Sequence, residues 1–371
     1  MGMFKNMLGA QESLFRDHVP LDYDYIPKLV PYREQEQRRI ASCIRPLLAQ
    51  RNGRNLFLFG PPGVGKTVAC RHLLKELEDE TEEAVPIYVN CWQKNTSYKI
   101  TLEICDLLDY KFTHNKKTDE LFKIIKDALN KKAVVLVLDE VDKLEDNDFI
   151  YAFLEDVYRK SVILITNYKD WITRLDDRIK SRLTAELLEF RPYDLEETRG
   201  IMKERLKFAF VQGCWDDAAF EMAVAKAHEL HDIRAGLYLL KEAGNAAEDR
   251  SSKSITAEHM KTAIGKLEDF SIKRKDDLED DTKSVLDLVK RNSGKKIGEV
   301  YKTYQQEGGQ MGYKTFQRKI AKLAENRFIS VKKVTGGAEG STTIIRSAGK
   351  TLEDFEDKGA GPKDVPEEDI E

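Results

Sequence analysis

Short apolar runs alternate with amphipathic stretches between residues 54 and 195. Apolar runs of about four to eight residues predict buried strands, and amphipathic stretches predict helices that cover those strands. The runs lie at 55–60, 86–90, 133–140 and 161–167, and 186–190 is a plausible fifth strand. Because strands that alternate with helices form parallel sheets, the pattern predicts an α/β domain.

The strand pattern disappears after Pro192, and the chain then predicts helices up to about residue 270. Asp194 and Glu197 are spaced as a capping box, which marks the start of the first of these helices. The charged stretch 271–284 follows and predicts a boundary between this helical region and the C-terminal part.

Three short amphipathic patterns occupy 282–292, 296–306 and 313–328. They precede two β-branched runs joined by a glycine-rich turn, which predict a β-hairpin. Three helices and a two-stranded wing form a winged helix, a relative of the helix-turn-helix. In its third helix Phe316, Ile320 and Leu323 have core spacing and are expected to be buried.

These patterns predict five parts of the chain. They are a lead-in segment at 1–40, an α/β nucleotide-binding subdomain at 41–193, a helical lid at 194–272, a winged-helix domain at 273–350 and an acidic disordered tail at 351–371. The tail is expected to be disordered because it combines prolines and glycines with many like charges.

The net charge of −4 conceals an uneven distribution. Residues 282–350 contain fifteen Lys and Arg against five Asp and Glu, whereas residues 352–371 contain nine acids and two bases. A compact basic module is typical of nucleic-acid binding, although a solvated lysine-rich surface is the alternative. The chain has no apolar run of about 18 residues and no secretory signal, so we expect a cytoplasmic, nucleoid-associated protein without a membrane partner. Five scattered cysteines without metal-ligand spacing predict no zinc site.

The stretch 57–74 contains a strand, a glycine-rich turn and a helix, and it fits the pattern G-x-x-x-x-G-K-[ST]. Backbone N–H groups and a helix N-terminus in such a unit bind phosphates. We therefore expect ATP or ADP to contact the loop residues Gly60, Gly63, Val64, Gly65, Lys66 and Thr67. Lys66 supplies charge to the β- and γ-phosphates, and the Thr67 hydroxyl is a candidate Mg²⁺ ligand.

Asp139 and Glu140 stand at the carboxyl end of the expected strand 133–140, where a doubly wound sheet presents its ligand-binding residues. Asp139 is suited to the Mg²⁺ shell, and Glu140 is suited to polarise an attacking water. Asn167 ends the neighbouring strand and is a candidate sensor of the γ-phosphate. The alternative for the two acids is that they cap the next helix.

Arginines are candidates for completing the site. Arg178 and Arg182 lie four residues apart, and either could stabilise transition-state charge at the nucleotide of an adjacent subunit. The alternative is ordinary pairing with Asp176, Asp177 or Glu186. Arg234 stands early in an expected helix and could reach the phosphates, which would couple their state to the angle of the lid.

The third helix of the winged helix is expected to enter the major groove of DNA. The candidate DNA contacts in its N-terminal half are Tyr313, Lys314, Thr315, Gln317 and Arg318. The wing adds Lys332 and Lys333 beside the minor groove.

The order of these motifs resembles that of the AAA+ ATPases. Within that superfamily the chain resembles the archaeal origin-recognition and cell-division-control initiator proteins, which open DNA replication. The resemblance covers about residues 14–350. It rests on the lead-in 14–40, on 188–210, on the D-x-R element that begins at Asp232, and on the winged helix.

The resemblance implies that Tyr193 and Arg205 line the base and ribose side, that Arg234 is the second sensor and that Arg182 is the finger. Tyr193 could equally be a core tyrosine. His231 departs from the glycine that the family usually has before Asp232. Residues 110–120 occupy the place of the family's DNA-contacting insertion, although Lys116 and Lys117 could simply cap the next helix.

The expected function is therefore that of a replication initiator with slow, regulatory ATP hydrolysis. It would bind origin duplex DNA under the control of ATP or ADP, associate with other protomers and help to recruit the replicative helicase. Two alternatives remain at this point. One is a clamp-loader-like or helicase-loader-like AAA+ protein, and the other is an ATP-sensing transcriptional regulator whose winged helix reads promoters.

Overall fold

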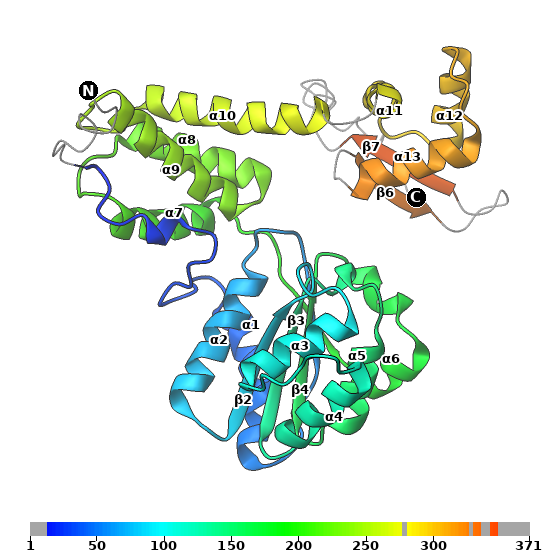
Figure 1. The fold of residues 1–371 in the computed structure, drawn as a ribbon. Coiled ribbons are helices and arrows are strands. Elements are labelled where there is room, and N and C mark those ends of the chain that lie inside the picture. The colour runs from blue at the N-terminus through cyan, green and yellow to red at the C-terminus, as the bar shows by residue number, and fades with distance from the viewer. Residues whose placement is uncertain (1–12, 277–279, 326–328, 335–341, 348–371) are drawn as a thin grey trace, which may run out of the picture. The chain divides into compact units, whose positions relative to one another are not determined.

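The computed structural model describes residues 13–276, 280–325, 329–334 and 342–347. The chain divides into two compact units, Met1–Leu267 and Glu268–Glu371. Figure 1 shows the elements of both units along the chain. The expected acidic tail and the tip of the expected wing lie outside the described residues.

The larger unit contains a five-stranded parallel sheet in the order β2-β3-β4-β1-β5. The strands are β1 (Leu56–Phe59), β2 (Ala84–Asn90), β3 (Ala133–Asp139), β4 (Lys160–Thr166) and β5 (Glu186–Glu189). All five apolar runs thus form strands, as the sequence predicts. The order places β1 and β3 on either side of β4, so the loops after these strands meet at one edge of the sheet.

Burial along the strands follows their position in the sheet. β3 is central, and all seven of its residues are buried. β2 and β5 are edge strands and show alternating exposure, so the expectation of a continuously buried strand at 86–90 is wrong. An edge strand has a neighbour on one side only, which leaves some of its side chains in contact with solvent.

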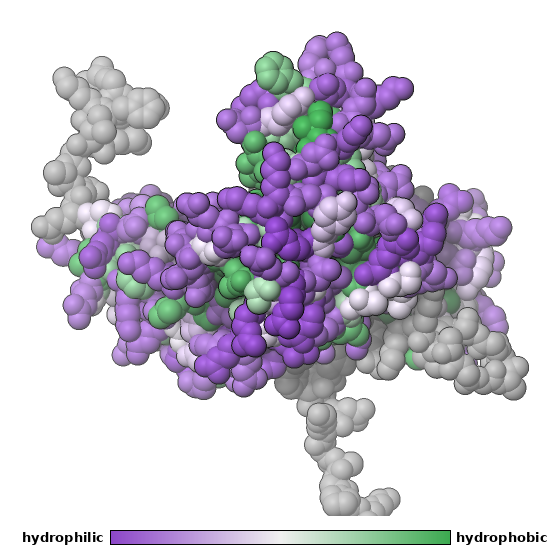
Figure 2. Space-filling model, turned by 90° about the horizontal axis from the view of Figure 1, so that it is seen from below, coloured by the Kyte–Doolittle hydropathy of each residue, from purple (hydrophilic) through white to green (hydrophobic). Residues whose placement is uncertain are grey.

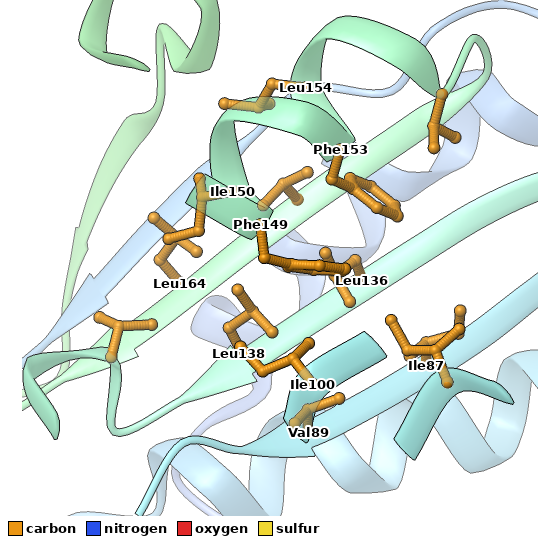
Figure 3. Packing of buried hydrophobic residues seen from close by; sticks show 14 of the residues in the cluster. Ile87, Val89, Ile100, Leu136, Leu138, Phe149, Ile150, Phe153, Leu154 and Leu164 are labelled. Carbon is orange, nitrogen blue, oxygen red and sulfur yellow. The ribbon is translucent and has the colours of Figure 1, made fainter. Parts of the chain in front are cut away.

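Helices cover both faces of the sheet. Figure 1 shows α1 (Glu34–Ile44) and α2 (Lys66–Glu80) on one side and α5 (Asp148–Asp156) and α6 (Asp177–Leu183) on the other, where α3 (Ser97–Leu107) and α4 (Thr118–Leu129) also pack. Figure 3 shows the second interface, in which Phe149 and Phe153 of α5 point toward Leu136 and Leu138 of β3. Apolar clusters on both faces of the sheet therefore fix the strands, and with them the loops at the carboxyl ends of β1, β3 and β4.

The lid consists of α7 (Leu195–Ala209), α8 (Asp217–Leu230), α9 (Ile233–Asp249) and the first part of α10 (Ala257–Asp276). The predicted capping box at the start of α7 is confirmed, since Asp194 and Glu197 each accept a hydrogen bond from the other's backbone N–H. The lead-in segment also belongs to this core, because Phe15 pairs with Phe210 and packs against its ring.

The smaller unit contains α11 (Asp280–Arg291), α12 (Ile297–Gln306), α13 (Tyr313–Glu325) and the antiparallel strands β6 (Ile329–Val334) and β7 (Thr342–Ser347). A bridge between Lys296 and Ile344 attaches the hairpin to the start of α12. This arrangement is the predicted winged helix. The expected boundary at 271–284 is largely helical, since α10 continues to Asp276 and α11 begins at Asp280.

The face of the molecule drawn in Figure 2 is predominantly polar. Figure 2 shows a mostly hydrophilic face on which hydrophobic residues appear in small separate groups. Among the described helices, none is both long enough and apolar enough to cross a membrane.

Candidate functional sites

The glycine-rich loop, residues 60–65, connects β1 to α2 through left-handed backbone geometry. Gly63 and Gly65 have φ angles of 76° and 88°, which glycine adopts without steric cost. A Cβ at Gly60 would lie 2.2 Å from the Phe190 carbonyl oxygen. The loop therefore requires glycines both for its turn and for its close approach to β5.

Lys66 is the first residue of α2, and its ammonium group donates hydrogen bonds to the loop and to the end of β4. It donates to the carbonyl oxygens of Gly60 and Pro61 at 2.8 and 2.7 Å. It also donates to Oδ1 of Asn167 at 2.9 Å. The structure thus brings together the lysine of the loop and the candidate sensor at the end of β4.

Asp139 is 2% exposed and accepts several hydrogen bonds. Its Oδ2 accepts from the Thr67 hydroxyl at 2.6 Å and from the Tyr88 hydroxyl at 2.9 Å, while its Oδ1 accepts from the Glu140 N–H at 2.9 Å. Burial raises the pKa of Asp139, and these hydrogen bonds act in the opposite direction by favouring the carboxylate. Sequence analysis predicted Thr67 and Asp139 as a pair but did not single out Tyr88.

The oxygen donors of this pair fit a Mg²⁺ ion. Carboxylate and hydroxyl oxygens are the ligands that Mg²⁺ prefers, and it takes few of them from the protein because it keeps water and phosphate oxygens. The Thr67 hydroxyl donates its hydrogen bond to Asp139, so its oxygen lone pairs are available for a metal. Within the described residues no cluster of three or more His, Cys, Asp or Glu forms a separate metal site.

Glu140 follows Asp139 and has a φ angle of 55°, an uncommon left-handed conformation for glutamate. Burial and the nearby charges of Asp139 and Asp142 raise the pKa of Glu140. A carboxylate with a raised pKa is a better proton acceptor at neutral pH, which suits the predicted role in polarising water.

Tyr193 is buried, and its hydroxyl faces the glycine-rich loop. A Cβ at Gly65 would lie 2.7 Å from the Tyr193 hydroxyl oxygen. Burial raises the pKa of Tyr193 to about 12, so the phenol is protonated at neutral pH. The side chain thus packs between Arg33 and the glycine-rich loop, and its predicted place on the base and ribose side stays a prediction.

Arg33 has no assigned role in the sequence analysis, yet it is fully buried behind the glycine-rich loop. Its Nε donates to the Val64 carbonyl oxygen at 3.0 Å, and its guanidinium also donates to Glu36 and to the Arg191 carbonyl. The guanidinium lies 3.9 Å from the centroid of the Tyr193 ring. The sequence signal for Arg33 was its place in the lead-in 14–40, on which the family resemblance partly rests.

Arg205 lies against the lead-in segment. Its guanidinium is 4.8 Å from the centroid of the Tyr25 ring and 3.5 Å from the Pro20 carbonyl oxygen. Burial lowers the pKa of Arg205. Arg205 thus contacts the lead-in residues Pro20 and Tyr25, and its predicted place on the base and ribose side stays a prediction.

The start of α9 approaches the glycine-rich loop from the lid. A Cβ at Gly63 would lie 2.1 Å from Oδ1 of Asp232. Asp232 caps α9 and forms a two-point ion pair with Arg234, at 3.0 Å from Nε and 2.8 Å from Nη2. The candidate second sensor is therefore close to the loop but held by its own cap.

The backbone conformation of His231 is one that glycine adopts most readily. It ends α8 with φ 51°, in the left-handed region where a side chain is strained. The helix start at Asp232 is nevertheless formed, so the substitution adds strain without removing the cap.

Arg178 and Arg182 lie on α6 beside the Tyr151 ring, at 5.6 and 5.1 Å from its centroid. Arg178 pairs with Asp176, as the alternative predicted. Arg182 pairs with Glu155 of α5 instead of Glu186. Both guanidinium groups are exposed on the surface of the unit.

In the winged helix, α13 separates its apolar and polar residues. The expected burial of Phe316, Ile320 and Leu323 is confirmed. The candidate DNA contacts are exposed, namely Tyr313, Lys314, Thr315, Gln317 and Arg318. Tyr313 also packs edge-on against Tyr301, with 4.9 Å between the ring centroids.

Lys332 and Lys333 are residues of β6, but their side chains lie outside the described part of the structure. The predicted insertion at 110–120 comprises most of the α3–α4 connection and the first residues of α4. Phe112 in the connection is 77% exposed, and the Lys117 N–H donates to Glu120 at the start of α4.

Family models match both parts of the larger unit. A model described as an AAA domain matches residues 49–168, and a model of the Cdc6 AAA+ ATPase-type lid domain matches residues 199–265. The chain is 30% identical to ORC1-type DNA replication protein 1 of Archaeoglobus fulgidus over 87% of this chain and 84% of that protein. It belongs to the family of ORC1-type DNA replication proteins.

Other relatives agree with this assignment. ORC1-type DNA replication protein 1 of Sulfolobus acidocaldarius is 31% identical, with 90% of each chain covered. The solved structure of the Aeropyrum pernix ORC1 protein in complex with DNA has a TM-score of 0.68 and 26% identity over 92% of this chain and 95% of that chain. The Aeropyrum pernix ORC2 protein, solved as ADPNP–ADP complexes, has the same fold, with a TM-score of 0.70 and 17% identity over 91% of this chain and 94% of that chain.

Membership in the ORC1-type family accounts for the order of elements in this chain. The AAA domain carries the glycine-rich loop and the acidic pair, the lid carries the D-x-R element, and the winged helix follows. The predicted family and fold class are therefore confirmed.

Proposed function

We propose that this protein is a replication initiator that binds duplex DNA at an origin and is controlled by the nucleotide in its AAA domain. One observation carries the proposal. A glycine-rich loop with its lysine, threonine and acidic pair occurs in the same chain as a winged helix whose third helix exposes polar and cationic residues. The DNA complex of the Aeropyrum pernix ORC1 protein supports it.

The nucleotide site would act through positioning and charge. Backbone N–H groups of the glycine-rich loop and Lys66 would hold the phosphates, and Mg²⁺ held through Thr67 and Asp139 would supply countercharge. Glu140 would polarise a water that Asn167 helps to orient. Because Arg234 starts α9, its contact with phosphate would change the position of the lid.

The DNA site would combine contacts to base edges, which give sequence specificity, with contacts to phosphates, which give affinity. Thr315 and Gln317 in the first half of α13 can bond to base edges in the major groove, whereas Lys314 and Arg318 are suited to phosphates. Lys332 and Lys333 of the wing would add contacts beside the minor groove. Electrostatic binding of this kind weakens with salt, by about one power of the salt concentration for each neutralised phosphate.

Further partners follow from the same proposal. Arg182 would complete the nucleotide site of a second initiator protomer, so hydrolysis would be slow in an isolated chain. The nucleotide state would then set whether the DNA-bound protein recruits the replicative helicase at the nucleoid.

The test is a titration of labelled origin duplex with full-length protein loaded with ADP or a non-hydrolysable ATP analogue. Arg318→Ala should lower the affinity about tenfold at moderate salt and reduce the salt dependence, because one phosphate contact is lost. Lys253→Ala, which removes an exposed lysine of the lid, is the matched control. Equal affinity of wild type and Arg318→Ala for duplex would contradict the DNA part of the proposal.

Mapping of bound DNA across the genome separates the initiator from a transcriptional regulator. Occupancy concentrated at a replication origin, and altered in Lys66→Ala, supports the initiator. Occupancy confined to promoters supports the regulator, and absence of duplex binding supports a loader whose C-terminal module binds protein.

A further inference from the structure

Tyr88 lies on β2 beside the metal-binding pair and is not among the residues that the function so far uses. Its hydroxyl donates to Oδ2 of Asp139 at 2.9 Å, the same oxygen that accepts the Thr67 hydroxyl at 2.6 Å. With the Glu140 N–H on Oδ1, both carboxylate oxygens are held. The orientation of the Asp139 carboxylate is thereby set by three donors from three different positions of the chain.

The sheet register explains how Tyr88 reaches this carboxylate. β2 and β3 are parallel neighbours, with Tyr88 opposite Val137 and Asn90 opposite Asp139. The tyrosine therefore starts two residues before Asp139 along the strand, and its long side chain extends to the carboxyl group. The Arg71 guanidinium of α2 lies 5.5 Å from the centroid of the Tyr88 ring and covers it from the helix layer.

The three donors have different consequences when a metal binds. Thr67 is itself a candidate ligand, and the Glu140 N–H belongs to the backbone next to Asp139. Tyr88 is the side chain that acts on Asp139 without being suited as a ligand, because the hydroxyl of its half-buried phenol donates a hydrogen bond to the carboxylate. Burial and the neighbouring Asp139 carboxylate raise the pKa of the Tyr88 phenol.

We propose that Tyr88 is a positioning residue for the Mg²⁺ site, which orients the Asp139 carboxylate through the hydrogen bond from its hydroxyl to Oδ2. The inference rests on the proposed nucleotide-binding function and adds to it a residue outside the glycine-rich loop and the acidic pair. Loss of a hydrogen bond to a metal ligand commonly lowers metal affinity about 10- to 100-fold. Tyr88 should therefore affect metal affinity and leave metal-free nucleotide binding unchanged.

The experiment measures binding of a fluorescent ADP analogue to full-length Tyr88→Phe protein, first in EDTA and then across a titration of free Mg²⁺. The ring and its packing against Arg71 are kept, so the fold should be retained. The free Mg²⁺ concentration that produces half of the Mg²⁺-dependent change in analogue binding should rise about 10- to 100-fold. The affinity for the analogue in EDTA should stay at the wild-type value. Tyr238→Phe, in a half-buried tyrosine of the lid core, is the matched control and should leave both values unchanged.

A second variant tests whether Tyr88 acts through Asp139. In an Asp139→Asn background the further change Tyr88→Phe should have no additional effect on the Mg²⁺ dependence, since effects that pass through one group do not add. An unchanged Mg²⁺ dependence in Tyr88→Phe, an equal loss of affinity in EDTA, or full additivity with Asp139→Asn would each overturn the inference. Failure of the wild-type protein to bind the analogue would instead contradict the proposed function.

Discussion

The Arg33 guanidinium lies 3.9 Å from the centroid of the Tyr193 ring, with both side chains buried. The arrangement links three distant parts of the chain, because Arg33 also donates to the Val64 carbonyl of the glycine-rich loop and to the Arg191 carbonyl that follows β5. A planar guanidinium can stack on the ring while its N–H groups donate within its plane, whereas an ammonium group donates but has no planar face to stack. The lead-in segment thus fixes the loop from behind.

Arg33→Lys should consequently destabilise the protein although the charge is kept. We expect the free energy of unfolding to fall by about 3 kcal/mol, because hydrogen bonds of buried groups are lost. Urea unfolding measures this value. The comparison variant is Arg39→Lys on the exposed face of α1, whose pairing with Glu186 is at the surface and whose replacement should cost less than about 1 kcal/mol. Similar losses in the two variants would contradict the structural role of Arg33.

Asp232→Asn should tighten nucleotide binding. The Asp232 carboxylate lies against Gly63 and holds Arg234, so it both repels phosphate and occupies the candidate sensor. Asparagine caps a helix about as well as aspartate, so α9 should still form. We expect an affinity gain of about tenfold, which corresponds to about 1.4 kcal/mol, measured by titration with ADP.

The double variant Asp232→Asn/Arg234→Ala provides the control for that result. If the gain depends on release of Arg234, it should disappear in the double variant. Tightening that persists without Arg234 would mean that repulsion by Asp232 alone is responsible.

Arg182 and Arg178 should differ in their effect on ATP hydrolysis. Arg178 is tied to the cap of its own helix, whereas Arg182 pairs with Glu155 of another helix. If Arg182 serves a neighbouring protomer, Arg182→Ala should reduce hydrolysis about a thousandfold at high protein concentration with unchanged ATP affinity. Phosphate release measured over a range of protein concentrations tests this, and Arg174→Ala, with its exposed pair to Asp170, is the control.

Asp139→Asn should stabilise the nucleotide-free protein at neutral pH. Burial raises the folded-state pKa of Asp139 above its ordinary value of 3.8, so the stability that this group contributes is present below that value and is lost as pH rises through the folded pKa. Asparagine removes the charge but turns its NH₂ group toward one of the donors that the carboxylate accepts, and we expect a net gain of about 1 kcal/mol at pH 7. Urea unfolding from pH 7 toward pH 4 should show the gain shrinking, and a gain independent of pH would exclude the carboxylate as its cause.

His231→Gly should raise the free energy of unfolding by about 1 kcal/mol, because the left-handed backbone at this position costs a non-glycine residue about that much. Thermal unfolding measures the change. Ala225→Gly within α8 is the control, and the opposite effect is expected there. Glycine has a lower helix propensity than alanine, so this change should lower the free energy of unfolding by about 1 kcal/mol. Destabilisation by both changes would show that contacts of the His231 side chain stabilise the fold by more than its left-handed backbone costs.

The sequence alone determined the parts that depend on local pattern. The strand ranges, the glycine-rich loop with Lys66, and the capping box at Asp194 follow from spacing that only one local geometry satisfies. The burial of Phe316 in α13 is of the same kind, because helical periodicity fixes which side of a helix is apolar.

Tertiary structure decided which side chains from distant segments of the chain contact each other. No spacing relates Arg33 to Tyr193, or Tyr88 to Asp139, because these contacts arise from the sheet order and from the packing of the lead-in segment. The same holds for Arg182, whose partner is Glu155 of a neighbouring helix instead of the acid nearer in sequence. Periodicity describes one element at a time, whereas the direction and burial of a long polar side chain depend on the element packed against it.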